Sequence, residues 1–246
     1  DGVFSADPRI VPAASRRAFL TYEEMLELAA QGAKVLHLRC VEYARRFDLP
    51  IHVRSSFSLD EGTMIVGRIE GDPMEQPIIS GVAHDRTQAK ITVLGVPDRP
   101  GEAAAIFQSL ARSEVNIDMI VQNVSAVETG RTDITFTLPV SDGKAALAGL
   151  ETVKGSIGFE SLQYDEKIGK LSLIGAGMRS HPGVSATFFS SLADAGVNVQ
   201  LISTSEIRIS VVVLESDLDN AVRAVHAAFG LDTESGEAVV YGGTGR

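Results

Sequence analysis

The sequence predicts an α+β protein in which two tandem ferredoxin-like (βαββαβ) units follow a shorter N-terminal segment. Hydrophobic residues change several times along the chain between helical spacing and the strict alternation of half-buried strands. A set of motifs also returns about eighty residues later, from K-I-T-V-L-G at Lys90 to K-L-S-L-I-G at Lys170. A repeat of this length indicates a duplicated domain.

Composition excludes several classes of protein. The chain has 246 residues, 44% of them hydrophobic, with a net charge of −10 and one cysteine. This acidic balance argues against nucleic acid or anionic membranes as partners, because both would repel it. No apolar run approaches the length of a transmembrane helix, and no signal peptide is visible. The five histidines show no spacing typical of metal ligands.

The single cysteine, Cys40, cannot form a disulfide within the chain, which fits a reducing, cytoplasmic compartment. It lies in the apolar stretch V-L-H-L-R-C-V. We therefore predict a buried structural thiol rather than a nucleophile.

The N-terminal segment, residues 1–68, is predicted to contain loops, two helices and two strands. The first helix begins after Thr21, has a glutamate at its third position as in a capping box, and ends at Gly32. The second helix is predicted over residues 33–47. Its inward-facing residues are predicted to be Val35, Leu38, Val41 and Tyr43. Residues 69–89 form a polar linker and a leading strand.

The two repeat units span residues 90–166 and 167–246. Each shows a strand, a Pro-Gly step into an amphipathic helix, a Val-Asn junction, two strands, a second helix and a closing strand. The closing strands are predicted at about 159–163 and 238–241. The predicted inner face of the first helix is Ala103, Ile106, Phe107 and Leu110 in one unit, and Ser185, Phe188, Phe189 and Leu192 in the other.

The loop-to-helix junction at Pro100-Gly101 is a candidate carboxylate site. The first turn of a helix leaves backbone N–H groups unpaired and carries partial positive charge. Asp98 stands just before it, and the next strand supplies Asn116, Asp118 and Gln122. Such a set would suit a free amino acid, with its ammonium group on the acids. The same residues also fit a simpler interpretation, in which Asp98 caps a turn and Asp118 is solvated.

The second unit does not keep these acids, since Met178 aligns with Asp98 and Gln200 with Asp118. It retains Asn198 and adds Thr204, Ser205 and Glu206 at the end of its second strand. We therefore expect the first unit to bind an ammonium group better, and the second to contribute hydroxyl and amide contacts. Neither unit shows a catalytic set, so both are expected to bind rather than to react.

The motifs of the repeats resemble those of one known family. D-R-P-G-E-A-A, V-N-I-D-M-I-V-Q-N-V-S, S-H-P-G-V-S-A and S-T-S-E-I-R-I-S-V are similar to the paired ACT domains of aspartokinases. D-G-V-F-S-A-D-P-R-I-V-P and Y-E-E-M-L-E-L-A-A-Q-G-A-K-V-L-H resemble the end of that family's kinase domain. The resemblance implies that residues 1–68 are the C-terminal fragment of an α/β amino-acid-kinase domain, followed by ACT domains at 90–166 and 167–246.

The resemblance also implies a function. Aspartokinases transfer the γ-phosphoryl group of MgATP to the β-carboxylate of aspartate, and a variant of the family that this sequence resembles is inhibited by threonine together with lysine. MgATP would act in the complete enzyme, and no tightly bound cofactor is expected in this chain. Family ligands lie between ACT units of different chains, which implies a homodimer or an αβ hetero-oligomer.

Site residues carried over from the family fall on three sets of positions. Those of the first ACT unit, beside the helix start at Gly101, are Asp98, Asn116, Ile117, Asp118 and Gln122. Those of the second unit are Val184, Ser185, Asn198, Val199, Ser205 and Glu206. Those of the nucleotide site are Val3, Phe4, Ser5, Ala6, Asp7, Pro8, Arg9 and Lys34.

Three interpretations of the whole chain follow. It is the regulatory portion of an aspartokinase, a stand-alone ACT-type module that regulates another enzyme, or a small intact kinase. The family's N-terminal K-F-G-G motif and aspartate-binding residues are absent from the sequence, so we do not expect this chain alone to phosphorylate aspartate. Met74 either corresponds to an internal start that yields a separate β subunit in some relatives, or is an ordinary linker residue.

Overall fold

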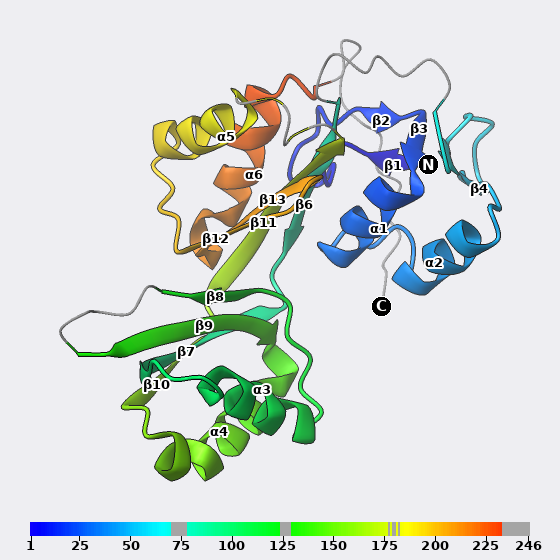
Figure 1. Cartoon of the computed structure of the whole chain (residues 1–246). Helices are drawn as coiled ribbons and strands as arrows, with labels where there is room; N and C mark the ends of the chain where they lie inside the picture. The colour runs from blue at the N-terminus through cyan, green and yellow to red at the C-terminus, as the bar shows by residue number, and fades with distance from the viewer. Residues whose placement is uncertain (70–77, 124–128, 177, 179–180, 182, 233–246) are drawn as a thin grey trace. The chain divides into compact units, whose positions relative to one another are not determined.

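The computed structural model describes residues 1–69, 78–123, 129–176, 178, 181 and 183–232. The chain forms two compact units, one of residues 1–85 with 170–246 and one of residues 86–169 (Figure 1). The predicted strand at 238–241 and most of the linker, including Met74, lie outside the described residues. Within them, no helix is long and apolar enough to cross a membrane.

The unit of residues 86–169 has the predicted βαββαβ order. Its elements are β7 (Gln88–Pro97), α3 (Glu102–Arg112), β8 (Ile120–Gln122), β9 (Arg131–Pro139), α4 (Gly143–Ile157) and β10 (Ser161–Asp165). The antiparallel sheet has the strand order β10-β7-β9-β8. Both helices cover one face (Figure 1), and the core between the layers includes Ile91, Ile106, Phe136 and Leu150.

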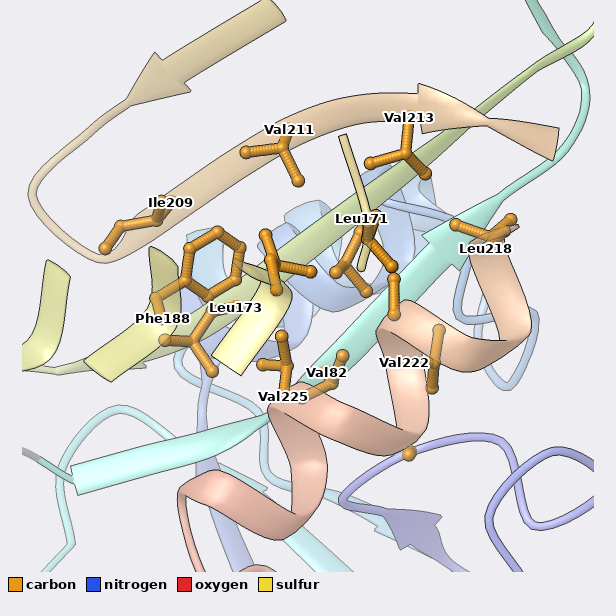
Figure 2. Packing of buried hydrophobic residues seen from close by; sticks show 14 of the residues in the cluster. Val82, Leu171, Leu173, Phe188, Ile209, Val211, Val213, Leu218, Val222 and Val225 are labelled. Carbon is orange, nitrogen blue, oxygen red and sulfur yellow. The ribbon is translucent and has the colours of Figure 1, made fainter. Parts of the chain in front are cut away.

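The larger unit contains a second sheet, with the order β12-β13-β11-β6. Its elements are β6 (Ile78–Asp85), β11 (Ile168–Ala176), α5 (Gly183–Asp194), β12 (Leu201–Thr204), β13 (Arg208–Leu214) and α6 (Leu218–Ala228). Figure 2 shows the core between sheet and helices, where Leu173 and Val211 meet Phe188 and Val225. Both helices bury an apolar stripe against this face of the sheet.

Strand β6 has a partner that the sequence analysis did not predict. It pairs with β11 in antiparallel fashion, with Asp85 opposite Lys170 and Ile78 opposite Ala176. Residues 86–169 are therefore inserted between two neighbouring strands of the second sheet. The sequence analysis treated the domains as consecutive parts of the chain, because local periodicity shows that a strand exists but not which strand it pairs with.

The N-terminal segment adds small sheets and two helices to the larger unit. Strands β1 (Val3–Phe4) and β2 (Arg16–Arg17) pair with each other, and β3 (Phe19–Thr21), β5 (Thr63–Val66) and β4 (Ile51–Val53) form a three-stranded sheet. Helix α1 (Tyr22–Ala30) begins with the predicted capping box. The Glu24 N–H donates to Thr21 Oγ1 at 3.3 Å, and the Thr21 N–H donates to Glu24 Oε2 at 2.8 Å.

Helix α2 (Leu38–Arg46) is shorter than predicted, because it starts at a cap provided by His37 instead of at residue 33. Its buried residues are Val41 and Ala44, while Tyr43 is 63% exposed and Val35 lies before the helix and is also exposed. The prediction of a buried Cys40 is wrong. Its position next to Val41 places it about 100° away from the buried face, and its thiol is exposed and donates to the His37 carbonyl.

Candidate ligand sites in the two repeat units

A surface pocket of about 480 Å³ lies in the larger unit, between the β12–β13 hairpin and the start of α5. Its walls combine three hydroxyl groups, one carboxylate, one imidazole and two apolar side chains. They come from Ser185, Thr204, Ser205, Glu206, His181, Met178 and Ile209. A small pocket with mixed apolar walls and a few convergent polar groups is typical of small-molecule sites.

The hairpin that carries four of these residues is held by backbone hydrogen bonds. The Ser205 N–H donates to the Arg208 carbonyl at 2.8 Å and closes the turn, and the Gly175 N–H donates to the Ile207 carbonyl at 3.0 Å. Together these bonds tie the turn to β11. They present Ser205 and Glu206 beyond the end of the sheet, where both side chains are exposed.

The start of α5 supplies Ser185, although not in the way the sequence predicted. Ser185 was assigned to the inner face of this helix, but it is exposed, and Val184 is buried instead. The buried residues Val184, Phe188 and Leu192 are spaced by four, so they form one stripe and turn Ser185 outward. This outward position brings Ser185 into the pocket.

The structure therefore gathers only part of the predicted second-unit site. Ser185, Ser205 and Glu206 line the pocket together. Val184 belongs to the core, and Asn198 and Val199 precede β12 without lining the pocket. Sequence reasoning missed Met178, His181 and Ile209 as pocket residues. Their only signals were proximity to the Pro-Gly step and to the end of the hairpin.

The predicted site in the other unit lies along an edge strand and a loop. The Asp98 N–H donates to the Gly130 carbonyl at 2.9 Å, and Gly101 caps α3 with a positive φ of 101°. The Asp118 N–H donates to the Thr137 carbonyl at 3.0 Å. Asp118 and Gln122 are both exposed, whereas Met119 is buried, as the predicted alternation requires.

A second pocket, of about 450 Å³, lies elsewhere in the same unit. None of the predicted effector residues line it. Two of its charged side chains form hydrogen bonds within the protein. Arg131 donates to the carbonyls of Gly95 and Gly158, and Asp133 accepts a hydrogen bond from the Gly95 N–H at 2.9 Å. These bonds brace the irregular pairing of β7 with β9.

The predicted nucleotide residues divide between interior and surface. Val3, Ser5 and Ala6 are buried, Phe4, Asp7 and Pro8 are half-buried, and Arg9 and Lys34 are exposed. Asp7 and Arg9 form an ion pair at 2.6 Å. Partial burial opposes ionisation of Asp7, but the hydrogen bonds and charge of Arg9 outweigh it and lower the pKa of that carboxyl group.

Ser5 takes part in a buried network with the last helix. Its hydroxyl lies 2.8 Å from His226 Nε2, and His226 Nδ1 lies 3.0 Å from Asp232 Oδ1. Burial lowers the pKa of His226 despite the nearby Asp232 carboxylate, which favours the neutral imidazole. This serine–histidine–aspartate set is structural, because Ser5 and His226 are both fully buried and no substrate can reach them.

No metal site is present in the part of the chain that the structure describes, since no three histidine, cysteine or acidic residues there are grouped to hold an ion. The polar groups of the pocket beside α5 are one carboxylate, one imidazole and three hydroxyls, which can form hydrogen bonds with a small organic molecule.

Two four-stranded antiparallel sheets, each with two helices on one face, and a ligand-sized pocket at the strand-to-helix junction of the second define the class of protein. Residues 91–153 and 171–229 match the ACT domain family, and residues 1–55 match the amino acid kinase family. The chain is thus a tandem ACT-domain protein that carries the C-terminal part of an amino-acid-kinase domain.

Comparison with individual proteins identifies the family. The aspartokinase of Mycolicibacterium smegmatis is 60% identical over the whole chain, which spans 58% of that relative's length. The regulatory subunit of aspartate kinase from Thermus thermophilus is 40% identical, with 61% of this chain and 98% of that one covered and a TM-score of 0.58. E. coli aspartokinase III in complex with lysine and aspartate is 25% identical, with coverages of 92% and 49% and a TM-score of 0.72. The chain belongs to the aspartokinase family and comprises its regulatory-type region.

Proposed function

We propose that this chain is the allosteric regulatory portion of an aspartokinase, which converts ATP and L-aspartate to 4-phospho-L-aspartate. In this proposal it binds threonine, lysine or both as end products and inhibits the enzyme. The observation that carries the proposal is the pocket of the larger unit, where Glu206 and three hydroxyl groups converge in a chain 60% identical to an aspartokinase.

The chemistry of this pocket suits an amino acid. Glu206 would pair with the ligand's ammonium group, and the hydroxyls of Ser185 and Ser205 would donate to its carboxylate. The start of α5 adds partial positive charge on the carboxylate side. Met178 and Ile209 would contact the alkyl part of the side chain. The lysine complex of the E. coli relative supports lysine as one ligand of the family.

A second effector site is proposed in the other ACT unit. Its residues are Asp98, Gly101, Asn116, Ile117, Asp118 and Gln122. Asp118 just before the edge strand β8 and Gln122 at its end are exposed, so a ligand there would be enclosed only if another subunit covered it. This arrangement supports assembly through ACT domains, as a homodimer or an αβ hetero-oligomer. Val184, Asn198 and Val199 are proposed to support the second unit's site from its edges.

A screen of the twenty amino acids by thermal denaturation tests the proposal. Threonine or lysine should raise the melting temperature, because a ligand at a hundred times its Kd adds about 2.7 kcal/mol to the unfolding free energy. No shift with threonine, lysine or methionine would overturn the assignment.

The two sites should also differ in ligand preference. Asp98→Ala and Glu206→Ala are expected to weaken binding of different amino acids, since only the first unit has acids at both aligned positions. Isothermal titration of both variants measures this, and Glu42→Ala on the exposed side of α2 serves as the control. Equal losses for every ligand in both variants would contradict two distinct sites.

The nucleotide-binding role of residues 3–9 and Lys34 is part of the same proposal, with MgATP as a substrate of the complete enzyme. The exposed Lys34 and Arg9 fit phosphate contacts, whereas buried Ser5 fits a supporting role. Hydrogen exchange over residues 3–9 with an ATP analogue tests it. The alternative is a stand-alone ACT-type module that regulates another enzyme. In that case amino acids would bind to this chain without altering aspartyl-hydroxamate formation when the chain is joined to an aspartokinase catalytic domain.

A further inference from the structure

Helix α1 of the kinase segment contacts the second ACT sheet through a row of polar side chains. Glu24, Glu27 and Gln31 are spaced three and four residues apart, so they share one face of the helix and of its C-terminal cap. Figure 1 shows α1 on the side of this sheet away from α5 and α6. The contact lies entirely within the larger unit.

Each of these three side chains meets a different strand. Glu24 accepts a hydrogen bond from Ser80 on β6. Gln31 Oε1 accepts one from Ser172 on β11 at 3.1 Å, and Ser172 is itself bonded to Ser210 on β13 at 2.7 Å. The third contact is an ion pair, in which Glu27 Oε2 lies 3.1 Å from Arg208 Nη1 on β13.

Two of the contacts are deeply buried. Glu24, Ser80, Gln31 and Ser172 are each less than 5% exposed. Buried polar groups are costly unless they are paired, so these bonds determine where α1 lies on the sheet. Neither β6 nor β11 contributes a residue to the walls of the ligand pocket. The contacts of Glu24 and Gln31 with these strands therefore act as anchors that do not involve the pocket.

The Arg208–Glu27 ion pair differs from these anchors because Arg208 lies next to residues that line the pocket. Arg208 precedes Ile209, a pocket residue, and follows Glu206 by two positions. Side chains alternate along a strand, so Ile209 faces the pocket and core while Arg208 faces α1 on the other side of the sheet. The turn bond from Ser205 to the Arg208 carbonyl joins the pocket wall directly to this residue.

The pair is also suited to respond to small shifts. The side chains of Arg208 and Glu27 are 18% and 25% exposed, so solvent screens their attraction only in part. Among the described residues, Arg208 Nε is buried without a hydrogen-bond acceptor. The guanidinium is therefore incompletely satisfied in this arrangement, and a displaced hairpin could offer it a better one.

We propose that the Arg208–Glu27 ion pair transmits occupancy of the ligand pocket to α1 and thus to the amino-acid-kinase segment. A ligand that contacts Ser205 and Glu206 repositions the hairpin backbone, and Arg208 moves with it. Glu27 follows Arg208, while the buried contacts of Glu24 and Gln31 hold the two ends of the helix. The inference rests on the proposed function of the pocket.

Hydrogen exchange of the α1 amides, with and without saturating threonine or lysine, tests this route. In the wild-type chain the ligand should change exchange over Tyr22–Ala30 at least twofold. Glu27→Gln keeps the size of the side chain but removes its charge. It should abolish this change while the Kd from titration stays within threefold. Glu23→Gln is the matched control on the same helix, because Glu23 pairs with Arg45 at the surface.

A charge-swapped double variant separates coupling from damage to the fold. Glu27→Arg and Arg208→Glu should each abolish the response of α1, and the two together should restore it. Failure of the double variant to restore it, or an unchanged response in Glu27→Gln, would overturn the inference. Ligand binding to wild type without any change in α1 would also overturn it, yet leave the proposed function standing. A wild-type chain that binds neither amino acid would overturn both.

Discussion

The hydrogen bonds of the His226 imidazole involve a residue that is distant in sequence. Ser5 lies 221 positions before it, yet the two side chains share a hydrogen bond in the interior of the larger unit. Because the Asp232 carboxylate can only accept, the neutral imidazole donates Nδ1–H to Asp232, which leaves Nε2 to accept from Ser5. Both ring nitrogens are thus paired, which compensates for burial of the imidazole.

This environment predicts a pH dependence of stability. Burial, assisted by the charge of Arg17 and opposed by Asp232, lowers the folded-state pKa of His226 below its ordinary value of 6.5. The unfolded chain therefore binds this proton at a higher pH than the folded chain. The unfolding free energy should be fully retained above about pH 7 and should fall as the pH drops through 6.5 towards the lowered pKa.

Urea denaturation between pH 5 and about pH 8 measures this effect. His226→Gln should flatten the pH dependence over this window, because an amide can donate and accept without titrating. The exposed His52→Gln serves as the control and should keep the wild-type profile. A profile that stays the same in His226→Gln would show that another group is responsible.

At the level of elements, α1 shows how local sequence and tertiary contacts combine. Its start was predictable, because Thr21 and Glu24 have the spacing of a capping box. Its role in the fold was not, since Glu24 also binds Ser80 on β6. The predicted start of α2 was too early, because the apolar residues within 33–37 resemble the beginning of a helix. In the structure these residues form a turn, and the helix begins after the cap at His37.

Removal of the α1 cap should destabilise the larger unit. Thr21→Ala loses the acceptor of the Glu24 N–H and should lower the unfolding free energy by about 1 kcal/mol. Chemical denaturation measures the loss. Thr152→Ala on the exposed side of α4 is the control, because that hydroxyl only donates back to a helix carbonyl and its removal should change stability little. Equal effects of both substitutions would argue against a special role for the cap.

At the level of the whole molecule, one ACT unit is inserted into the other. Asp85 and Lys170 lie opposite each other at the end of the β6–β11 pairing. The chain of residues 86–169 begins after one of them and ends before the other, so both of its ends are at this point. Domain insertion is tolerated at such sites because the two ends of the inserted unit are close together. The outer pair of the inserted unit, Lys90 opposite Asp165, shows the same closeness.

The insertion predicts that residues 86–169 can be excised. A chain that joins Asp85 to Lys170 through Asn-Gly should form a two-residue hairpin and keep the larger unit folded. Circular dichroism during heating should show one cooperative transition. The same deletion extended through β6 should abolish it, because β11 then loses its partner along one edge. A non-cooperative transition in the first variant would contradict the prediction that the larger unit folds without residues 86–169.

The sequence by itself determined the duplication, the order of strands and helices in the first repeat and from β11 to α6 in the second, the cap of α1 and the family resemblance. These features depend on residues within one element or on motifs that recur in order. Only the tertiary structure decided that β6 completes the second sheet, that Cys40 is exposed, and that His181 and Ile209 join Glu206 in one pocket. Each of these depends on contacts between segments far apart in sequence, which hydrophobic spacing does not encode.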